Sequence, residues 1–346
     1  MIKEKVLVGM SGGVDSSVTA KLLLEAGYIA AGVTLELCET ENDSSITDAE
    51  SVCKKMGIKH YTVNLKSQFS HYVISDFIDQ YKRGNTPNPC IVCNRYIKFG
   101  AMLDTALSYG FDKIATGHYA RIKRDDNGRY LLLKALDESK DQSYVLYNLT
   151  QNQLSRVLFP LGELSKAQVR EKAIEEGFVN ANRPDSQDIC FVPDGDYAGF
   201  IEREDGFTPK IGNYIDINGK ILGRHSGIIH YTLGQRKGLG IALGKPAFVI
   251  KKDIFSNNVV LGDEEHLFKT EVIVDSVNFI PFDKLRSEMR VTVKLRYRHK
   301  AAEAVIVPIN DTQVKIIFDE SQRAPSPGQA AVFYDDDIVV GGGTII

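Results

Sequence analysis

Apolar residues in the first half of the chain recur at spacings that alternate between strand-like and helix-like. Residues 6–10 form a continuous apolar run typical of a buried strand, and residues 18–26 place apolar side chains at helical spacing until Gly27 ends the pattern. The alternation continues with predicted strands at residues 29–35, 61–64 and 113–116 and predicted helices at residues 47–56, 69–81, 97–108, 151–158 and 166–177. This βαβα order predicts an α/β fold, in which a parallel sheet carries helices on both faces.

The second half of the chain has a different pattern. Beyond about residue 195, short β-like runs are separated by turn residues, and from about residue 272 several alternating strands follow with few helical signals. A small β-barrel or a sandwich is typical of such a pattern. Because 346 residues are too many for one typical core, we expect several domains. The predicted domains are an α/β domain at residues 1–200, a small central domain at residues 201–268 and a C-terminal β-barrel at residues 269–346.

Composition places the chain among ordinary globular proteins. It is 43% hydrophobic and 25% charged, and no apolar stretch approaches the roughly 20 residues that a membrane-spanning helix needs. The start of the chain runs directly into the first predicted strand, which leaves no room for a signal peptide. Five cysteines with one close pair fit a reducing compartment, so we expect a cytoplasmic protein with reactive thiols. Since the net charge is −3, any nucleic-acid site must come from locally clustered charge.

A glycine-rich turn joins the first predicted strand to the first predicted helix. Its sequence, Ser-Gly-Gly-Val-Asp-Ser-Ser at residues 11–17, lets the backbone approach an anion, because Gly12 and Gly13 carry no Cβ. The amides of the following helix would point at that anion, with the helix dipole behind them. The Gly-Lys-Ser/Thr of a P-loop is absent, and an ordinary strand-to-helix turn is the alternative. The turn resembles the PP-loop of the ATP pyrophosphatases, which cleave ATP between its α and β phosphates, and residues 9–16 are called the cradle below.

Three cysteines are candidates for reactive thiols. Cys90 and Cys93 form a Cys-x-x-Cys pair after two prolines, and Cys190 follows a polar, turn-rich segment. A helix is predicted to start just after Cys93, and a helix N-terminus stabilises a thiolate and lowers its pKa. Burial or half of a zinc site is the alternative, although no second close pair exists to complete such a site. Cys38 and Cys53 are interpreted as structural.

Six segments resemble, in order, those of the tRNA-specific 2-thiouridylase family. They span nearly the whole chain and lie at residues 88–99, 115–119, 140–144, 185–191, 231–238 and 327–329. The resemblance implies an enzyme that uses ATP to replace the C2 oxygen of the wobble uridine of tRNA by sulfur. Because a carbonyl oxygen is a poor leaving group, AMP would first be attached to it with loss of pyrophosphate. Sulfur would then displace AMP and give 2-thiouridine.

The resemblance also assigns binding roles. The nucleotide would be bound by the cradle and two further positions, namely Gly9, Met10, Ser11, Gly12, Gly13, Val14, Asp15, Ser16, Leu35 and Gly117. Asp15 would help to place Mg²⁺, an ion that prefers oxygen ligands. The tRNA, with its target base flipped out of the stack, would be contacted by Asn88, His118, Lys140, Asp141, Gln142, Arg296, Tyr297 and Gln329. From the residue alone, His118 could equally be a structural histidine.

The same resemblance assigns the sulfur chemistry to two cysteines. Cys190 would receive sulfur as a persulfide from a partner protein, either a cysteine desulfurase or a sulfur carrier. Cys93 would then attack the base or free the sulfide. A Cys93–Cys190 disulfide would remain and would need external reduction before the next turnover.

One position departs from the best-known members of the family. They carry an aspartate, which is assigned acid–base work, where this chain has Cys90. A thiol with an ordinary pKa near 8.5 is less suited to protonate a leaving group at neutral pH. The change also creates a trio of Cys90, Cys93 and Cys190, and three thiolates can hold an iron–sulfur cluster with one iron open, although four ligands are the norm. The sequence leaves both a persulfide relay and a cluster open.

A basic segment near the C-terminus is a candidate tRNA contact. Between residues 284 and 300 the chain has many Lys and Arg residues and a single acid, Glu288. From Val291 onward, period-two alternation predicts one strand face that carries Lys294, Arg296, Arg298 and Lys300. Such a stripe suits phosphate contacts, and a merely solvated strand face is the alternative. The glycines and cations of residues 231–240 predict a further tRNA contact in the central domain.

Two other functions compete with thiolation. An amidating synthetase acting on a small acid, of the NAD or argininosuccinate type, shares the cradle but needs neither the Cys93 and Cys190 pair nor a basic β tail. A non-catalytic RNA-binding or sulfur-carrier protein would retain only a vestigial nucleotide site. The intact Gly12, Gly13 and Asp15 disfavour that second alternative.

Overall fold

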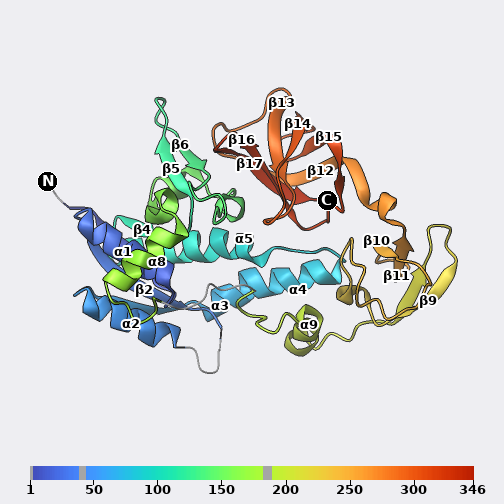
Figure 1. Ribbon diagram of the computed structural model, residues 1–346, viewed down its shortest axis with the longest axis horizontal. Coiled ribbons are helices and arrows are strands. Elements are labelled where there is room, and N and C mark those ends of the chain that lie inside the picture. The colour runs from blue at the N-terminus through green and yellow to red at the C-terminus, as the bar shows by residue number, and fades with distance from the viewer. Residues whose placement is uncertain (1–2, 39–43, 182–188) are drawn as a thin grey trace.

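The N-terminal part of the computed structural model is a five-stranded parallel sheet (Figure 1). The structure describes residues 3–38, 44–181 and 189–346. The strands, in spatial order, are β3 (His60–Asn64), β2 (Ile29–Glu36), β1 (Lys5–Gly9), β4 (Lys113–Ala115) and β7 (Val157–Leu158). Every neighbouring pair is parallel, which confirms the α/β fold predicted from the alternating pattern.

The strands bury apolar side chains on both faces of this sheet. Successive residues of β1 point to opposite sides, so Val6 belongs to one buried cluster and Leu7 to another. Three helices pack in the cluster of Val6, namely α1 (Val14–Glu25), α2 (Ser45–Lys55) and α8 (Lys166–Glu175). The cluster of Leu7 contains residues of α6 (Met102–Ser108). Helices therefore cover both faces, as predicted.

Two long helical segments run from the sheet towards the other end of the molecule (Figure 1). The first joins α3 (Lys66–Phe69), η1 (Ser70–Ile74) and α4 (Ser75–Lys82), and the second joins α5 (Pro89–Cys93), η2 (Asn94–Ala101) and α6. The second segment begins before both of its cysteines, and the prediction that it starts after Cys93 is wrong. Asn88 caps it by accepting a hydrogen bond from the Cys90 N–H (3.2 Å), and proline suits the first helical position.

The helix predicted at residues 151–158 is only partly correct. Its first half is α7 (Gln151–Leu154), which begins with a capping box between Thr150 and Gln153. Its second half is β7, because the chain leaves the helix after one turn and pairs with β4 at the edge of the parallel sheet.

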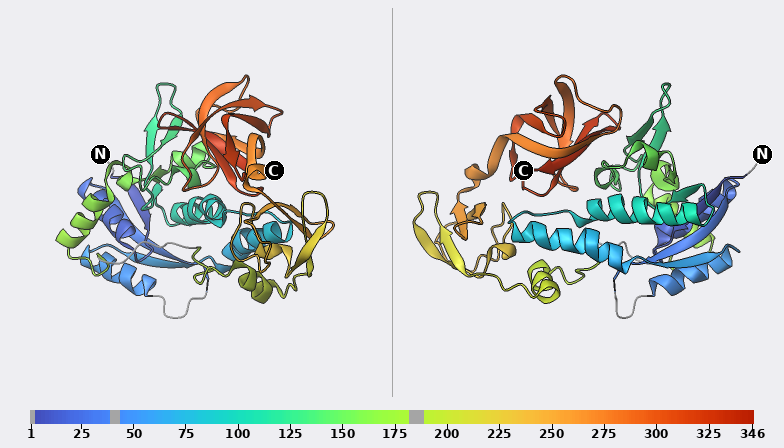
Figure 2. Two further views of the ribbon diagram at one scale, coloured as in Figure 1. Left: turned by 45° about the vertical axis from the view of Figure 1, so that its right-hand side comes forward. Right: turned by 180° about the vertical axis from the view of Figure 1, so that it is seen from behind.

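The C-terminal part is a closed antiparallel barrel (Figure 2). Its strands, in spatial order, are β12 (Phe268–Phe279), β15 (Val314–Arg323), β14 (Ala302–Pro308), β13 (Met289–Lys294), β16 (Ala330–Asp335) and β17 (Ile338–Ile345). Pairing of β12 with β17 closes the ring, so the predicted barrel is confirmed and the sandwich alternative is not. A hairpin of β5 (Arg121–Arg124) and β6 (Tyr130–Leu133) extends the sheet at β17.

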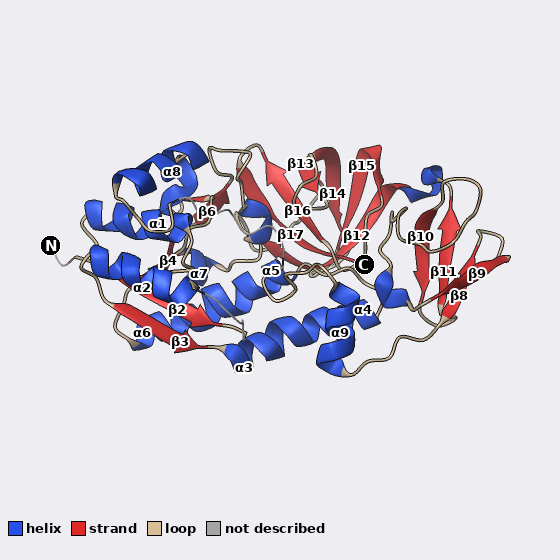
Figure 3. Cartoon of the chain, turned by 60° about the horizontal axis from the view of Figure 1, so that its bottom comes forward, coloured by secondary structure: helices blue, strands red, loops and turns tan. Residues whose placement is uncertain are grey.

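A small four-stranded sheet lies at the end of the molecule opposite the parallel sheet (Figure 3). Its strands, in spatial order, are β10 (Phe248–Asp253), β11 (Asn258–Gly262), β8 (Gly212–Ile215) and β9 (Ile221–His225), and α9 (Tyr197–Asp205) precedes them. The short 3₁₀ helices are η3 (Ser143–Val145), η4 (Pro160–Glu163), η5 (Ile228–His230) and η6 (Glu264–Leu267). No helix in the described part of the chain is both long and apolar enough to cross a membrane.

The barrel packs directly on the α/β part of the chain. One buried cluster contains residues of both, among them Tyr144 and Val332. The Tyr144 hydroxyl donates a hydrogen bond to the Ala330 carbonyl (2.9 Å), and the Thr86 N–H donates one to the Pro327 carbonyl (2.8 Å). These contacts place the barrel beside the segment that leads into the Cys90–Cys93 helix.

Candidate functional site

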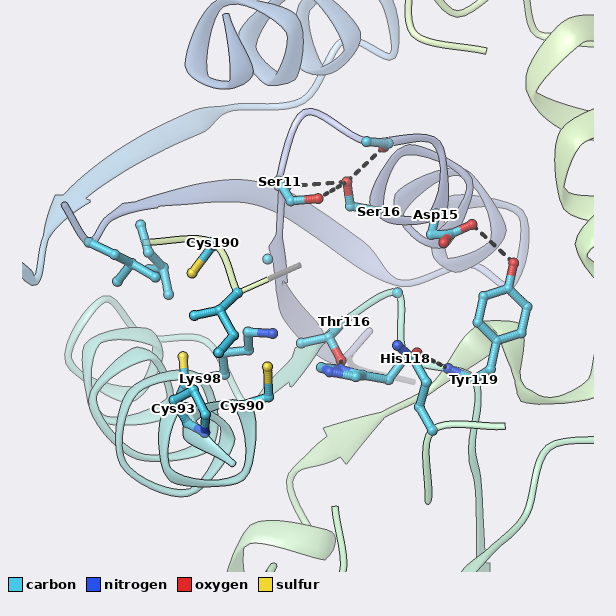
Figure 4. Close-up of a pocket in the computed structure, with 18 of the residues that line it drawn as sticks. Ser11, Asp15, Ser16, Cys90, Cys93, Lys98, Thr116, His118, Tyr119 and Cys190 are labelled. Atoms are coloured by element: carbon cyan, nitrogen blue, oxygen red, sulfur yellow. Dashed lines mark hydrogen bonds between the residues drawn. The ribbon is translucent and has the colours of Figure 1, made fainter. Parts of the chain in front are cut away.

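A large cavity opens at the carboxyl ends of β1, β2 and β4, where parallel sheets usually bind their ligands (Figure 4). Its volume is about 1860 Å³, whereas a site for one small molecule typically measures about 300–1,000 Å³. Segments that are far apart in the sequence line it, among them the cradle, the helix that carries Cys90 and Cys93, and residues 297–301 after β13. The cavity therefore has room for a nucleotide together with a second ligand.

Most of the predicted site residues line this one cavity. They are Gly9, Met10, Ser11, Gly13, Val14, Asp15, Ser16, Leu35, Cys90, Cys93, Gly117, His118, Lys140, Asp141, Gln142, Cys190 and Tyr297. Four predicted residues do not line it, namely Gly12, Asn88, Arg296 and Gln329. Of the segment 185–191 singled out in the sequence, residues 185–188 lie outside the described residues.

The cradle turns sharply between β1 and α1. Gly12 has a φ of +70°, which L-residues rarely adopt, and a Cβ there would lie 2.7 Å from the Ser45 backbone. The Ser16 hydroxyl donates to the Gly13 carbonyl (2.9 Å), and the Ser11 N–H donates to Ser16 Oγ (3.3 Å). These local bonds fix the turn while the first residues of α1 line the cavity. That geometry is the one expected for a phosphate site at a helix N-terminus.

Asp15 is already paired within the cradle. Its two carboxylate oxygens accept hydrogen bonds from Lys166 Nζ at 2.7 and 2.9 Å, and Oδ1 also accepts one from the Tyr119 hydroxyl at 3.0 Å. Because both oxygens are engaged, this geometry does not fit a carboxylate open to Mg²⁺. Sequence reasoning missed both partners, since Lys166 was only the first residue of an ordinary helical pattern.

The segment after α8 also contacts the cradle. Asn180 is buried, and its Nδ2 donates to the Gly12 carbonyl (2.8 Å) and to Ser17 Oγ (3.0 Å). Its Oδ1 has no hydrogen-bond partner among the described residues. A buried polar atom without a partner costs about 1–3 kcal/mol, so this amide is kept in place by its other contacts. Nothing in the sequence pattern indicated this residue.

The three cysteines reach the cavity from two segments (Figure 4). Cys90 and Cys190 are exposed, whereas Cys93 is only 7% exposed. Burial raises the pKa of the Cys93 thiol to about 11. Although Cys190 has exposed surface, many protein atoms surround its thiol, and this desolvation, together with the neighbouring thiols, raises the pKa of Cys190 to about 12. The lowered pKa predicted for Cys93 is therefore wrong, because the helix starts at Pro89 and leaves Cys93 buried inside it.

The remaining cysteines and the metal alternatives can also be placed. Cys53 is buried in the core, as predicted, whereas Cys38 lines the cavity. In the described part of the chain, no three His, Cys, Asp or Glu side chains are arranged to hold a metal ion. The iron–sulfur cluster held by Cys90, Cys93 and Cys190 stays a prediction, and we derive no step through one.

We predict that alkylation of the cavity thiols depends strongly on pH. Because only the thiolate reacts and the pKa values of Cys93 and Cys190 are raised to about 11 and about 12, each labelling rate should rise about tenfold per pH unit from about pH 7 to 9. Mass spectrometry of iodoacetamide-labelled peptides measures both rates. In denatured protein, the control, the rates should level off near the ordinary pKa of about 8.5. The same levelling in native protein would contradict the raised pKa values.

His118 is a neutral residue of the cavity wall. Its Nδ1 shares a hydrogen bond with Thr116 Oγ1 (2.7 Å), and its ring packs beside Phe99 and Phe159. Burial, assisted by the Lys98 ammonium, lowers the pKa of His118 well below its ordinary value, so the imidazole is uncharged at neutral pH. His118 is therefore fixed by its core contacts, as a structural histidine would be. It also lines the cavity, as a residue beside the target base would.

The loop predicted to border the target base is shaped by its own side chains. Asp141 is buried and accepts hydrogen bonds from the N–H groups of Ala135 (3.1 Å) and Ser143 (3.2 Å). Gln142 Oε1 accepts one from the Tyr119 N–H (2.9 Å). These bonds fix the loop in the wall of the cavity, next to the residues that contact Asp15.

The basic stripe predicted on one strand face is wrong. The strand β13 ends at Lys294, and residues 295–299 form bends and turns. Arg296 is turned inward, where its guanidinium donates to the Ala324 carbonyl (3.1 Å) and to Ser326 Oγ (2.9 Å). Period-two alternation cannot continue through such a turn. The residues of this segment that line the cavity are Lys294, Tyr297, Arg298, His299, Lys300 and Ala301.

Two predicted tRNA contacts lie outside the cavity and secure the loop before the cysteines. Gln329 Nε2 donates to the Thr86 carbonyl (2.7 Å), and Asn88 caps the helix at Cys90. Both side chains thus help to set the position of the Cys90–Cys93 helix against the barrel.

Three family models match consecutive parts of the chain. Their descriptions are a tRNA methyl transferase HUP domain at residues 4–194, a tRNA methyl transferase PRC-barrel domain at residues 199–263, and an aminomethyltransferase β-barrel domain at residues 269–345. The first of these alone covers more than half of the chain.

Curated relatives match from end to end. A protein of Acetivibrio thermocellus is 53% identical and covers 100% of both chains, and one of Lachnoclostridium phytofermentans is 50% identical and covers 99% of both. A protein of Clostridium acetobutylicum is 50% identical and covers 99% of this chain and 100% of its own. All three bear the name tRNA-specific 2-thiouridylase MnmA.

Solved structures give weaker matches. A 4-thiouridine synthetase in complex with RNA and ATP is 18% identical, with a TM-score of 0.36 over 58% of this chain and 53% of its own. An NMN synthetase from Francisella tularensis is 16% identical, with a TM-score of 0.35 over 60% of this chain and 79% of its own. Scores this low support no further comparison.

Proposed function

The chain belongs to the tRNA-specific 2-thiouridylase family, and we propose that it uses ATP to replace the C2 oxygen of the wobble uridine of tRNA by sulfur. The observation that carries the proposal is the single cavity that the cradle, the three cysteines and the turn after β13 line together. A reaction that first activates a carbon with ATP and then attacks it with sulfur needs both groups around one site. An amidating synthetase would have no use for the thiols.

The first step activates the base. The uridine C2 oxygen attacks the α-phosphate of ATP, and pyrophosphate leaves. The amides of the cradle and the N-terminus of α1 hold the phosphates and balance their charge. The adenosine lies beside Leu35 and Gly117, which line the cavity at the ends of β2 and β4. We assign no step to Mg²⁺, because the Asp15 carboxylate is engaged by Lys166 and Tyr119.

The second step transfers sulfur. A sulfur-donor protein, of the cysteine desulfurase or sulfur-carrier class, converts Cys190 into a persulfide. The terminal sulfur attacks C2, and AMP leaves with the electron pair of the C2–O bond. The Cys93 thiolate then attacks the Cys190 sulfur, so that the S–S bond to the transferred sulfur breaks and 2-thiouridine is released. A Cys93–Cys190 disulfide remains, and an external thiol reduces it.

The exposure of the two cysteines supports this division of roles. Cys190 is exposed, so a donor protein can reach it, whereas the buried Cys93 is accessible only to groups inside the cavity. The raised pKa values of both thiols keep them protonated at neutral pH until a reaction partner is bound. Such thiols are protected from unproductive oxidation between turnovers.

We predict different effects for two arginines of the turn after β13. Arg298 lines the cavity, so Arg298→Ala should weaken tRNA binding and lower the salt-dependence slope by about 1. Arg296 bonds to Ala324 and Ser326, so Arg296→Ala should instead lower the free energy of unfolding by about 1–3 kcal/mol. Filter binding at several salt concentrations and denaturant unfolding measure the two effects. If the salt dependence of tRNA binding is unchanged in Arg298→Ala, this turn does not contact the phosphates of tRNA.

Nucleoside mass spectrometry tests the proposed function. The protein is incubated with unmodified tRNA, ATP, Mg²⁺, a reducing thiol and a persulfide donor (a cysteine desulfurase with cysteine), and the tRNA is then digested. We expect a wobble uridine whose mass corresponds to exchange of one oxygen for sulfur, and none without ATP. A tRNA with cytidine at the wobble position is the matched control. Turnover of ATP on a small acid with no thiolated uridine would favour the amidating alternative.

A further inference from the structure

Lys166 is the first residue of α8, yet its side chain reaches the cradle. Its Nζ lies 2.7 Å from Asp15 Oδ1 and 2.9 Å from Oδ2, and it sits 5.8 Å from the centre of the Tyr119 ring. The Lys166 side chain is 11% exposed and that of Asp15 is 30% exposed. Because this pair is shielded from bulk water, the position of the ammonium is fixed far better than that of a surface lysine.

The backbone around Lys166 is also fixed. A capping box closes the start of α8, and the Lys166 N–H donates a hydrogen bond to Asp137 Oδ2 (3.0 Å). At the other end of the same segment, Asn180 Nδ2 donates to the Gly12 carbonyl (2.8 Å). The segment from Lys166 to Asn180 therefore contacts the cradle at two separate points, through the Lys166 side chain at one and the Asn180 side chain at the other.

The cradle itself supplies no cation. Asp15 is the only charged residue in positions 9–17, and the lysine of a P-loop is absent. A carboxylate in this place would repel the phosphates of ATP if nothing compensated its charge. Several lysines line the cavity, and Lys166 is not among them, but in the described part of the chain it is Lys166 that is bonded to Asp15, a residue of the cavity wall.

We propose that Lys166 is a ligand of the ATP phosphates, and that Asp15 positions it instead of serving as an open Mg²⁺ ligand. Lys166 then binds the phosphates as the lysine of a P-loop does, although it lies 151 residues after Asp15 in the sequence. Its ammonium binds the phosphates that become pyrophosphate and stabilises their charge as they leave. This inference rests on the proposed function only in that the cradle binds ATP.

A series of nucleotides tests the proposal without tRNA or a sulfur donor. Isothermal titration calorimetry gives the affinities of wild type, Lys166→Met and Lys166→Arg for adenosine, AMP, ADP and ATP. Loss of a charge-assisted hydrogen bond to a phosphate should weaken ATP binding about 10- to 100-fold in Lys166→Met, with less than about a threefold change for adenosine. Lys166→Arg keeps the charge and should recover most of the affinity. The same loss should persist in excess EDTA, since no metal ion is needed for this contact.

Lys172→Met is the matched control. Lys172 lies on the same helix and pairs with Glu25 of α1 at 2.9 Å, but it does not bond to the cradle. This variant should bind all four ligands as the wild type does. If Lys166→Met is too unstable to purify, Asp15→Asn combined with Lys166→Met removes both partners and leaves no unpaired buried charge.

Two results would overturn the proposal. The first is an equal loss of affinity for all four ligands in the Lys166 variants, which would show a purely structural role. The second is undiminished ATP affinity. If the wild type binds no ATP at all, the proposed function fails together with this inference. ATP binding by the wild type with no effect of the Lys166 variants contradicts the inference alone.

Discussion

Replacing Cys190 by serine should abolish 2-thiouridine formation, by at least about 10³-fold, while ATP binding stays unchanged. Serine keeps the size of the side chain but cannot carry a persulfide, and no hydrogen bond joins Cys190 to the described residues of the cradle. Nucleoside mass spectrometry of tRNA measures the first effect, and isothermal titration calorimetry measures the second. Because Cys190 is exposed, the substitution should leave the free energy of unfolding nearly unchanged.

Cys53→Ala provides the control for the loss of a thiol as such. Cys53 is a fully buried residue of α2 in the core and does not line the cavity. Its replacement should lower the free energy of unfolding by about 1 kcal/mol and leave thiolation intact. Thiolation at the wild-type rate by Cys190→Ser would remove this cysteine from the mechanism.

Gly117→Ala should weaken ATP binding by about 10- to 100-fold without unfolding the protein. A Cβ at Gly117 would lie 2.9 Å from the Asp15 carbonyl carbon and 3.0 Å from the Ser16 nitrogen. Both atoms belong to the backbone of the cradle, so the added methyl group can be accommodated only if the phosphate-binding turn moves. Isothermal titration calorimetry with ATP measures the loss.

Gly110→Ala is the control for this substitution. Gly110 has a φ of +78°, but nothing lies within 4 Å of the Cβ that alanine would add. This variant should lose about 1 kcal/mol of stability through its backbone conformation and keep its ATP affinity. Unchanged ATP affinity in Gly117→Ala would mean that the nucleotide does not use this turn.

The parts of the fold that the sequence predicts are those set by local periodicity. The strands of the parallel sheet follow from short continuous apolar runs, because both of their faces are buried, and those of the barrel follow from apolar alternation, because one buried face repeats every second residue. The glycine-rich turn could be recognised because its chemistry lies in consecutive residues. Local signals marked Cys93 and Cys190 separately as reactive thiols, and only the resemblance to the thiouridylase family placed them in one site.

The errors arise where contacts distant in sequence override the local pattern. The stripe through Arg296 was predicted from alternation, but bonds to Ala324 and Ser326 turn this segment after Lys294. The pKa of Cys93 was predicted from a helix N-terminus, whereas burial by other segments decides it. The residues next to Cys93 do not indicate how deeply other segments bury it, and those next to Arg296 do not indicate which distant carbonyl or hydroxyl its side chain binds.

The partner of Asp15 was missed for the same reason. Lys166 is far from Asp15 in the chain, and the sequence around a lysine at the start of a helix does not predict which other element its side chain contacts. The sequence alone therefore predicts the turn that binds a nucleotide, but only the folded structure shows that the Lys166 ammonium lies beside it.

The intact mass of tRNA after reaction with Cys190→Ser tests most directly whether ATP and sulfur act on one carbon in a single cavity. The variant is incubated with unmodified tRNA, ATP and the sulfur donor, and the tRNA is analysed without digestion. We predict tRNA that has gained AMP and no sulfur, since activation proceeds while sulfur transfer cannot. Unchanged tRNA, or tRNA that carries sulfur, would contradict it.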